Sequence, residues 1–231
     1  MDVWQIDLEH AGELDVFLEV LDEQEKDRAD RFRFENHARR FIVAHAATRF
    51  ILSSYCGIRA ADLVFEFNAY GKPFLANDGG PLFSLSHSDG TALCGVVATG
   101  EIGVDIEKCR DIADLEMSRR FFSGIECTLL DGLEEKQKTA GFFACWTRKE
   151  AYIKAKGLGL SLPLNEFSVE PAPHRPAALI ASDYAPDDVG RFRLWDVPAP
   201  AGYKAALAYC GAEEAPPVWR SWALGKCNRL G

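Results

Sequence analysis

The distribution of apolar residues along the chain predicts helices and strands in an order that occurs twice. Residues 3–8 alternate apolar and polar side chains, as a half-buried strand does. Helical spacing predicts helices over 12–22 and 23–34, and then a long helix that Asn36 caps and Gly57 ends. Short strand-like runs separated by Gly, Pro, Asn and Asp follow at Val64–Phe67, Pro73–Leu75, Phe83–Ser86, Thr91–Ala98 and Ile102–Glu107.

The second half of the chain repeats this order. Helical spacing returns near 114–122, 124–132 and 134–156, and strand-like runs follow at Phe167–Glu170, Ala178–Ala181, Arg191–Val197 and Tyr203–Cys210. The two long helices also carry similar text, because a Thr-Arg pair stands at Thr48-Arg49 in one and at Thr147-Arg148 in the other. We therefore expect an α+β chain of two similar halves that meet near residue 100, where a cleft would form.

Composition narrows the class of protein. The chain has 231 residues, of which 48% are hydrophobic and 26% charged, so it can bury a core and is not typical of disordered chains. No apolar run approaches the roughly 20 residues that cross a bilayer, and the N-terminus is acidic from its second residue, unlike a secretory signal. The 7 cysteines are odd in number and form no C-x-x-C motif, which favours free thiols in a reducing cytoplasm.

The net charge of −9 argues against a broad nucleic-acid surface, but it is unevenly distributed. Residues 1–25 hold nine acidic residues and no lysine or arginine. Residues 26–50 hold seven lysines or arginines against three acidic residues, a net charge of +4. An acidic protein of this kind can still offer a local basic pocket to a polyanion.

One strand-like run carries two carboxylates on the same face. Alternation places Ile102, Val104 and Ile106 on one side, and places Gly103, Asp105 and Glu107 on the other. Two carboxylates so close repel each other, which is explained either by a bound cation such as Mg²⁺ or by plain solvation of an exposed face. A D-x-E pattern alone favours the exposed face, because such short patterns recur by chance.

A second cluster of charged residues lies in the last long helix, between Trp146 and Lys154. Trp146, Glu150 and Lys154 share one helical face at intervals of four. Glu150 and Lys154 have the order of an ordinary surface ion pair, worth only a few tenths of a kcal/mol. Taken alone, the cluster is best explained as such a surface pair, although the large aromatic Trp146 in line with it argues for a half-buried face.

A third cluster, in the run from Phe83 to Gly90, combines serine, histidine and aspartate. A catalytic triad is not favoured, because adjacent strand residues face opposite ways and no G-x-S-x-G elbow is present. His87 and the serine hydroxyls could contact a phosphate or hydroxyl. Alternatively, Ser88 and Asp89 form a local turn. The glycine-rich run after Lys156 follows a helix, so we interpret it as a helix end and a turn.

The order and spacing of these motifs resemble the 4′-phosphopantetheinyl transferases of the surfactin (Sfp-like) type. The resemblance covers about residues 25–210, and Asp105 and Glu150 stand 45 residues apart, as the family pattern requires. Its motifs are Gly71-Lys72-Pro73, Ser86-His87-Ser88, Ile102 to Glu107, Arg119 to Ser123, Trp146 to Lys154 and Gly157 to Leu164.

This resemblance implies a fold, a substrate and a reaction. The fold would be a pseudo-twofold arrangement of two similar α+β halves. Residues 1–101 would form an N-terminal half that contacts the coenzyme A nucleotide, and residues 102–231 would form a C-terminal half with the metal and catalytic residues. The reaction would be Mg²⁺-dependent transfer of the 4′-phosphopantetheine arm from coenzyme A to a serine of an apo carrier protein, with release of 3′,5′-ADP.

The resemblance also implies roles for individual residues. Asp105, Glu107 and Glu150 would hold Mg²⁺, and Glu150 and Lys154 would be catalytic, with Lys154 also contacting the transferring phosphate. Lys72, Ser86 and His87 would contact the nucleotide end of coenzyme A. Family members place bases near the first long helix for the 3′-phosphate; the candidates are Arg28, Arg31, Arg39 and Arg40, of which we favour Arg28 and Arg40.

Rival functions are a Mg²⁺-dependent phosphohydrolase and a non-catalytic module that binds coenzyme A or a carrier protein. We expect no nucleic-acid or membrane partner, a cytoplasmic location, and a monomer, because one chain already contains both halves. By resemblance, a carrier helix would dock between Glu107 and Phe122, with Met117 in contact, and the acidic N-terminal stretch would lie away from that face.

Overall fold

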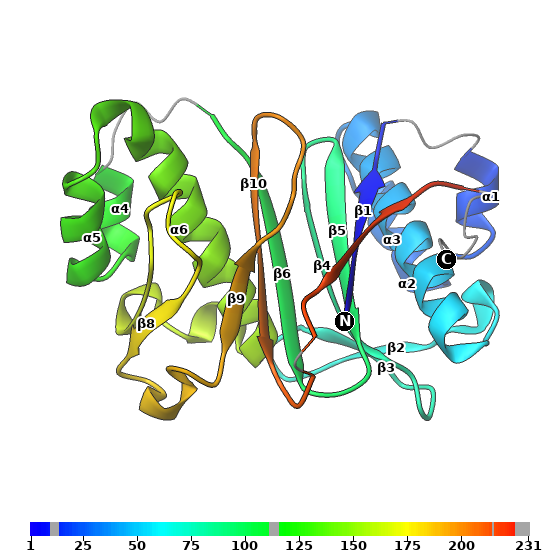
Figure 1. Ribbon diagram of the computed structural model, residues 1–231. Coiled ribbons are helices and arrows are strands. Elements are labelled where there is room, and N and C mark those ends of the chain that lie inside the picture. Colours follow the sequence, from blue (N-terminus) through cyan, green and yellow to red (C-terminus); the bar gives the residue numbers. More distant parts are fainter. Residues whose placement is uncertain (10–13, 111–115, 214, 225–231) are drawn as a thin grey trace.

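The computed structural model describes residues 1–9, 14–110, 116–213 and 215–224, with the side chains of 116–118 and 160 left out (Figure 1). The first half contains β1 (Asp2–Asp7), α1 (Leu14–Leu18), α2 (Glu23–Asp30), α3 (Glu35–Cys56), η1 (Ala60–Asp62), β2 (Phe65–Phe67), β3 (Pro73–Leu75), β4 (Leu82–Ser88) and β5 (Thr91–Val97). The second half contains β6 (Glu101–Lys108), α4 (Glu116–Phe121), α5 (Gly124–Asp131), α6 (Glu135–Lys156), η2 (Gly159–Ser161), η3 (Leu164–Glu166), β7 (Phe167–Val169), β8 (Leu179–Ser182), η4 (Pro186–Asp188), β9 (Arg193–Asp196), β10 (Tyr203–Cys210) and β11 (Val218–Trp222).

The predicted α+β class is confirmed, and the two halves repeat one strand order. The first sheet has the order β11-β1-β5-β4, and the second has the order β6-β10-β9. Apart from β11, each sheet has three strands, and the strand that comes last in the sequence lies between the other two. It pairs with both of them in antiparallel orientation. A pseudo-twofold arrangement would produce this repeat, but the axis itself and the division at residue 101 stay predictions. The C-terminal strand β11 returns to the first sheet, where it pairs with β1 in parallel.

The helices lie on the two outer sides of the molecule and the sheets lie between them (Figure 1). One core fills the space between α3 and the first sheet, and a second fills the space between α6 and the second sheet. A third core lies between the sheets, where Val3, Leu93 and Val97 meet Ile102 and Val104. The alternation predicted for residues 102–107 is therefore correct on its apolar side, which is buried against the other half.

The two long helices have the same length and the same ending. Each spans 22 residues and stops at a glycine in the left-handed conformation, Gly57 with φ 69° and Gly157 with φ 66°. Both stops were predicted, because glycine adopts this conformation without a side-chain clash. The predicted cap at Asn36 is wrong. The helix begins at Glu35, and the carbonyl of Phe34 accepts the N–H groups of His37 and Ala38.

Each long helix is also joined to a short helix by an ion pair from a buried cation to a capping-box glutamate. Asp22 begins α2 and Ser123 begins α5, each with a capping box completed by a glutamate three residues later. In the first half that glutamate is Glu25, which binds Arg49 of α3. In the second half Glu126 binds Lys149 of α6. The fully buried cations are thus neutralised by carboxylates whose positions the helix caps fix.

The two sheets meet where β4 runs along the free edge of β6, and serine side chains replace the backbone pairing there. The hydroxyls of Ser84, Ser86 and Ser88, which we call the serine ladder, accept the N–H groups of three β6 residues. The donors are Val104 at 3.1 Å, Ile106 at 3.4 Å and Lys108 at 3.1 Å. The serine ladder satisfies backbone donors that an unpaired strand edge would otherwise leave without partners.

Strand β11 was not predicted, because the apolar residues among the last twenty show no regular spacing. Its end is fixed by Trp222, which is 6% exposed and contacts Phe17 and Phe50. Along the described ranges of the chain, no helix has the length and apolar character that crossing a bilayer requires.

Candidate active site

Gly103 allows α6 to lie directly on β6. A Cβ atom at this position would overlap the Ala151 carbonyl oxygen and the Ala155 backbone nitrogen. Because β6 side chains alternate, Asp105 and Glu107 lie on the same face as Gly103, toward α6. The close approach therefore brings the predicted strand carboxylates to the part of α6 that carries Glu150 and Lys154.

Asp105 and Lys154 form the centre of this cluster. The Lys154 Nζ donates to Asp105 Oδ1 at 2.7 Å and to Ser86 Oγ at 2.8 Å. Ser86 Oγ donates in turn to the same Asp105 oxygen at 2.8 Å. The other oxygen, Asp105 Oδ2, is buried and has no hydrogen-bond partner among the described residues. A buried carboxylate oxygen without a partner is costly, so the site is prepared for a further cationic or donor group.

The two glutamates of the cluster are held less acidic than usual. Burial, followed by the charges of Asp105 and Glu107, raises the pKa of Glu150 to about 6, against the attraction of Lys154. Burial likewise raises the pKa of Glu107, with Asp105 adding to the effect and a hydrogen bond from Ser88 opposing it. Two glutamates with raised pKa values beside a further carboxylate are a typical environment for a functional site.

These carboxylates fit an oxygen-preferring cation in chemistry, although they do not form a closed cage. Within the described ranges, no three Asp, Glu, His or Cys side chains converge closely enough to hold a metal ion by themselves. The observations in favour are the Asp105 oxygen without a partner among the described residues, and the raised pKa values of Glu107 and Glu150, which burial and then neighbouring carboxylates cause. Mg²⁺ commonly takes only one or two protein carboxylates and completes its shell with substrate phosphates and water.

The run from Trp146 to Lys154 divides its charged residues between two sides of α6. Arg148 is fully buried and binds the Asp196 carboxylate at 2.7 Å, and Lys149 is fully buried against Glu126. Glu150 and Lys154 face the site, where Lys154 pairs with Asp105 rather than forming the ordinary helical surface pair with Glu150. Trp146 is half-buried and stacks on Phe142.

A cavity of about 1200 Å³ lies beside this cluster, in the first half of the molecule. Residues of α2, α3, the β2–β3 hairpin and β4 line it, including Arg28, Arg31, Phe41, His45 and His87. The carboxylate cluster does not line the cavity, because β4 separates them: His87 projects from one face of the strand, and the serine ladder projects from the other.

His87 connects the cavity to the cluster electrostatically. Desolvation in the cavity wall lowers the pKa of His87, and the charges of His45, Lys154, Arg28 and Arg40 lower it further. Arg28 of the cavity wall and Lys154 of the carboxylate cluster therefore both act on this one side chain. These cations attract an anion, and the acidic residues that also line the cavity oppose that attraction: Asp22, Glu23, Glu25, Asp27 and Asp62.

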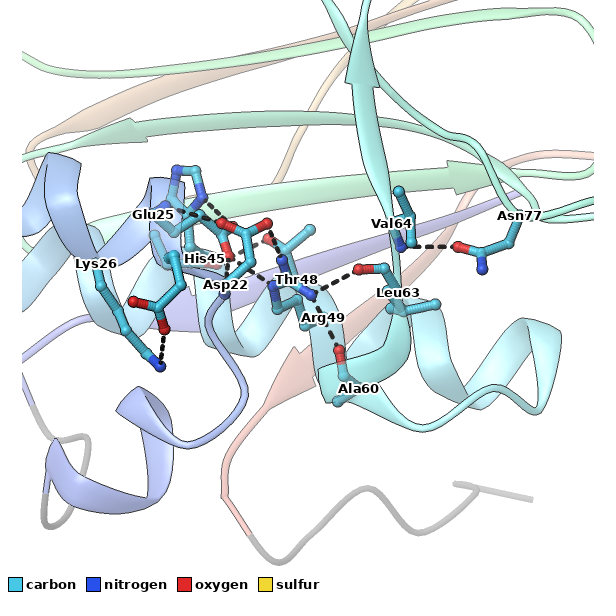
Figure 2. Close-up of polar contacts among 12 residues, drawn as sticks. Asp22, Glu25, Lys26, His45, Thr48, Arg49, Ala60, Leu63, Val64 and Asn77 are labelled. Carbon is cyan, nitrogen blue, oxygen red and sulfur yellow. Dashed lines mark hydrogen bonds and ion pairs between the residues drawn. The ribbon is translucent and has the colours of Figure 1, made fainter.

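Figure 2 shows a polar network at the edge of the cavity that the sequence did not reveal. Arg49 is fully buried and donates to Asp22 Oδ2 at 2.6 Å, to Glu25 Oε2 at 2.7 Å and to the Leu63 carbonyl at 2.9 Å. The other Glu25 oxygen lies 2.8 Å from His45 Nδ1. The D-x-x-E capping text at residues 22–25 was the available signal, but nothing local indicates its partners 20 or more residues away.

Of the other predicted contacts, Lys72 and Arg40 are already bound to protein groups. Lys72 Nζ donates to the carbonyls of Ile102 at 3.0 Å and Ala155 at 3.1 Å, and burial lowers its pKa to about 8. Lys72 thus ties the β2–β3 turn to the second half. Arg40 pairs with Glu9 at 2.7 Å and with Asp89 at 2.6 Å. Arg28 lines the cavity, where its guanidinium lies 5.2 Å from the Phe41 ring centre.

Residues 111–115, within the predicted docking segment, lie outside the described residues, and so does the side chain of Met117. Cys227 also lies outside the described part of the chain. The interpretation of the run after Lys156 as a helix end is correct, because the Gly157 N–H binds the Ile153 carbonyl at 2.9 Å.

Comparison with known proteins gives matches over both halves. Residues 8–99 match the family model "4′-phosphopantetheinyl transferase, N-terminal", and residues 101–208 match that of the "4′-phosphopantetheinyl transferase superfamily". The chain is 40% identical over 182 residues to the 4′-phosphopantetheinyl transferase HetI of a Nostoc species, covering 77% of this chain and 76% of that protein. It is 33% identical over 153 residues to the 4′-phosphopantetheinyl transferase Sfp of Bacillus subtilis, covering 66% and 67% respectively. A putative 4′-phosphopantetheinyl transferase of a Synechocystis species is 32% identical over 205 residues, covering 84% and 81%.

The raised pKa of Glu150 predicts a gain of stability when its charge is removed. The folded-state pKa of about 6 lies above the ordinary value of 4.5, so the free energy of unfolding falls as pH rises through this window. In buffer with EDTA at pH 7.5, Glu150→Gln should raise the Tm by about 2–4 °C, the shift that about 1 kcal/mol produces in a chain of this size. The difference from wild type should shrink as the pH approaches 4.5.

The measurement is thermal unfolding by circular dichroism at both pH values. Glu135→Gln is the matched control, because Glu135 lies on the exposed start of the same helix. Equal or lower stability of Glu150→Gln at pH 7.5 would contradict the electrostatic account of the cluster.

Proposed function

Since the chain belongs to the 4′-phosphopantetheinyl transferase family, we propose that it moves the 4′-phosphopantetheine arm of coenzyme A onto a serine of an apo carrier protein. The observation that carries the proposal is the Asp105–Lys154 pair with Glu150 beside it, adjacent to a large cavity whose lining includes Arg28 and Arg31. These are the residues that the family motifs singled out in the sequence. The helix and strand that bear them lie in direct contact.

We assign the cavity of the first half to the nucleotide of coenzyme A. Its volume of about 1200 Å³ is at the upper end for small-molecule sites, and coenzyme A is a large ligand. Arg28 supports binding of the 3′-phosphate, and His87 supports binding of the pyrophosphate on the way to Lys154. Contacts from Lys72, Ser86 and Arg40 to coenzyme A stay predictions, because the polar groups of all three side chains are bound to other groups of the protein.

The reaction forms a bond between the carrier serine oxygen and the β-phosphorus of coenzyme A, while the bond from that phosphorus to 3′,5′-ADP breaks. Glu150 is the proposed base for the serine proton: with a pKa of about 6, it is ionised at neutral pH and more basic than an ordinary carboxylate. Lys154 donates two of its three N–H groups to Asp105 and Ser86, so a third is available to a phosphate oxygen.

We further propose that Asp105, Glu107 and Glu150 hold Mg²⁺. The hard carboxylate donors and the partnerless Asp105 oxygen fit this ion. Bound there, Mg²⁺ would supply charge neutralisation at the pyrophosphate. The chain's own contribution is to fix Asp105 through Lys154 and Ser86, and to hold Glu107 and Glu150 half-buried beside it.

The remaining expectations belong to the same proposal. The protein would act as a cytoplasmic monomer without a nucleic-acid partner, and a carrier helix would dock along the segment between Glu107 and Phe122. Fatty-acid, polyketide and non-ribosomal peptide carriers are all compatible with the residues of the site. A panel of apo carriers is therefore part of the test.

The direct test incubates the protein with coenzyme A, Mg²⁺ and the carrier panel, and reads carrier intact mass and 3′,5′-ADP. We expect one carrier or more to gain the phosphopantetheine mass. Asp105→Asn, Glu150→Gln and Lys154→Ala should each lower the rate at least a hundredfold while remaining folded, because each removes charge stabilisation or the base. Glu135→Gln on the same helix should transfer normally.

Near-normal transfer by the three folded site variants would refute the assignment of this cluster. Release of 3′,5′-ADP at the same rate without a carrier would instead indicate the phosphohydrolase. Binding of coenzyme A with no turnover on any carrier would indicate the binding module.

Arg28→Ala tests the placement of the 3′-phosphate. We expect the KM for coenzyme A to rise about tenfold with little change in kcat, the loss of one charge-assisted contact made equally in ground and transition states. The KM for dephospho-coenzyme A, which lacks that phosphate, should hardly change. Arg191→Ala, an exposed residue of the second half, is the control. An equal rise of KM for both substrates would place Arg28 elsewhere on the ligand.

A further inference from the structure

The serine ladder does more than satisfy the edge of β6, because two of its three hydroxyls also bind carboxylates. Ser86 Oγ accepts the Ile106 N–H and donates to Asp105 Oδ1 at 2.8 Å. Ser88 Oγ accepts the Lys108 N–H and donates to Glu107 Oε2 at 2.8 Å. In both cases, the hydroxyl donates to the carboxylate of one β6 residue and accepts the backbone N–H of the next β6 residue.

The backbone bonds determine the direction in which the hydroxyl protons point. A serine hydroxyl has one proton and two lone pairs. An incoming N–H group occupies a lone pair and cannot accept, so the hydroxyl proton is directed to the carboxylate oxygen that lies 2.8 Å away. At Ser86 the Lys154 ammonium occupies the second lone pair, which leaves this hydroxyl no alternative arrangement.

Each of these bonds occupies one oxygen of a carboxylate and leaves the other free. Ser86 and Lys154 both bind Asp105 Oδ1, and the oxygen left over is the buried Oδ2 without a partner. Ser88 takes Glu107 Oε2, which leaves Oε1. Because Asp105 and Glu107 lie on the same face of β6, the two free oxygens are presented on one side of the strand.

We propose that Ser88 and Ser86 are positioning residues that fix the Glu107 and Asp105 carboxylates, so that one oxygen of each is presented to a divalent cation. The inference rests on the proposed function for the cation, and it adds an assignment for Ser88. It also gives Ser86 a role toward Asp105 and Lys154. A hydrogen-bond partner of a metal ligand typically contributes about tenfold or more to metal affinity.

Ser84 provides a matched control within the same structure. Its hydroxyl accepts the Val104 N–H at 3.1 Å, the same distance as the bond at Ser88, but it has no carboxylate partner. Ser84→Ala and Ser88→Ala therefore each remove a hydroxyl that accepts a backbone N–H group of β6. Only Ser88→Ala also releases a carboxylate.

The experiment titrates Mn²⁺ into the full-length protein saturated with coenzyme A and measures free Mn²⁺ by electron paramagnetic resonance, with thermal unfolding and carrier transfer in parallel. Ser88→Ala should weaken Mn²⁺ binding about tenfold, and Ser88→Thr, which keeps a hydroxyl, should restore it. Ser84→Ala should bind Mn²⁺ like wild type, although its Tm falls by a similar amount. If Ser88→Ala does not fold, Ser88→Cys makes the same comparison, because a thiol is a weak donor.

Equal Mn²⁺ affinities of Ser88→Ala and Ser84→Ala would overturn the positioning role, as would a wild-type protein that binds no Mn²⁺. Failure of the proposed function has a different signature. In that case the Mn²⁺ affinities follow the expected order, but no carrier gains the phosphopantetheine mass.

Discussion

The hydrogen bonds among Asp105, Lys154 and Ser86 join three elements that come from both halves of the chain. Ser86 lies on β4 of the first sheet, Asp105 on β6 of the second, and Lys154 near the end of α6. The pair can form only because Gly103 lets α6 approach β6, and because the serine ladder fixes β4 along the β6 edge. The packing of β4, β6 and α6 thus determines the position of Asp105 Oδ2, which has no hydrogen-bond partner among the described residues.

Strand β4 separates the cavity of the first half from the carboxylate cluster. His87 faces the cavity, while Ser86 and Ser88 on the opposite face bind Asp105 and Glu107. Under the proposed function, a long ligand would bind its nucleotide in the cavity on one side of β4 and reach past the strand with its pyrophosphate. Arg28, Arg31 and two histidines of that cavity would bind the polyanion under the proposed function, against the repulsion of the acidic residues that also line it.

The sequence predicted most of the elements that have a strong local pattern, and it failed where long-range contacts decide. Glycine at 57 and 157 marked both helix ends, and the alternation at 102–107 separated a buried apolar face from the carboxylates. In contrast, β11 has no period of its own and exists because β1 offers an edge. The partners of Lys72 and Arg40, and the network of Glu25 with Arg49, come from distant segments that spacing along the chain cannot reveal.

The central claim is that the free oxygen of Asp105, fixed where the two halves meet, is a ligand of the cation that acts on the substrate. The most direct test is a crystal structure with coenzyme A and Mn²⁺, using anomalous diffraction to locate the metal. We predict a peak about 2 Å from Asp105 Oδ2, a normal bond length for such an ion. The pyrophosphate should lie on the other side of the metal, toward His87. A peak that is distant from Asp105, or a pyrophosphate bound without any metal beside that carboxylate, would contradict the account.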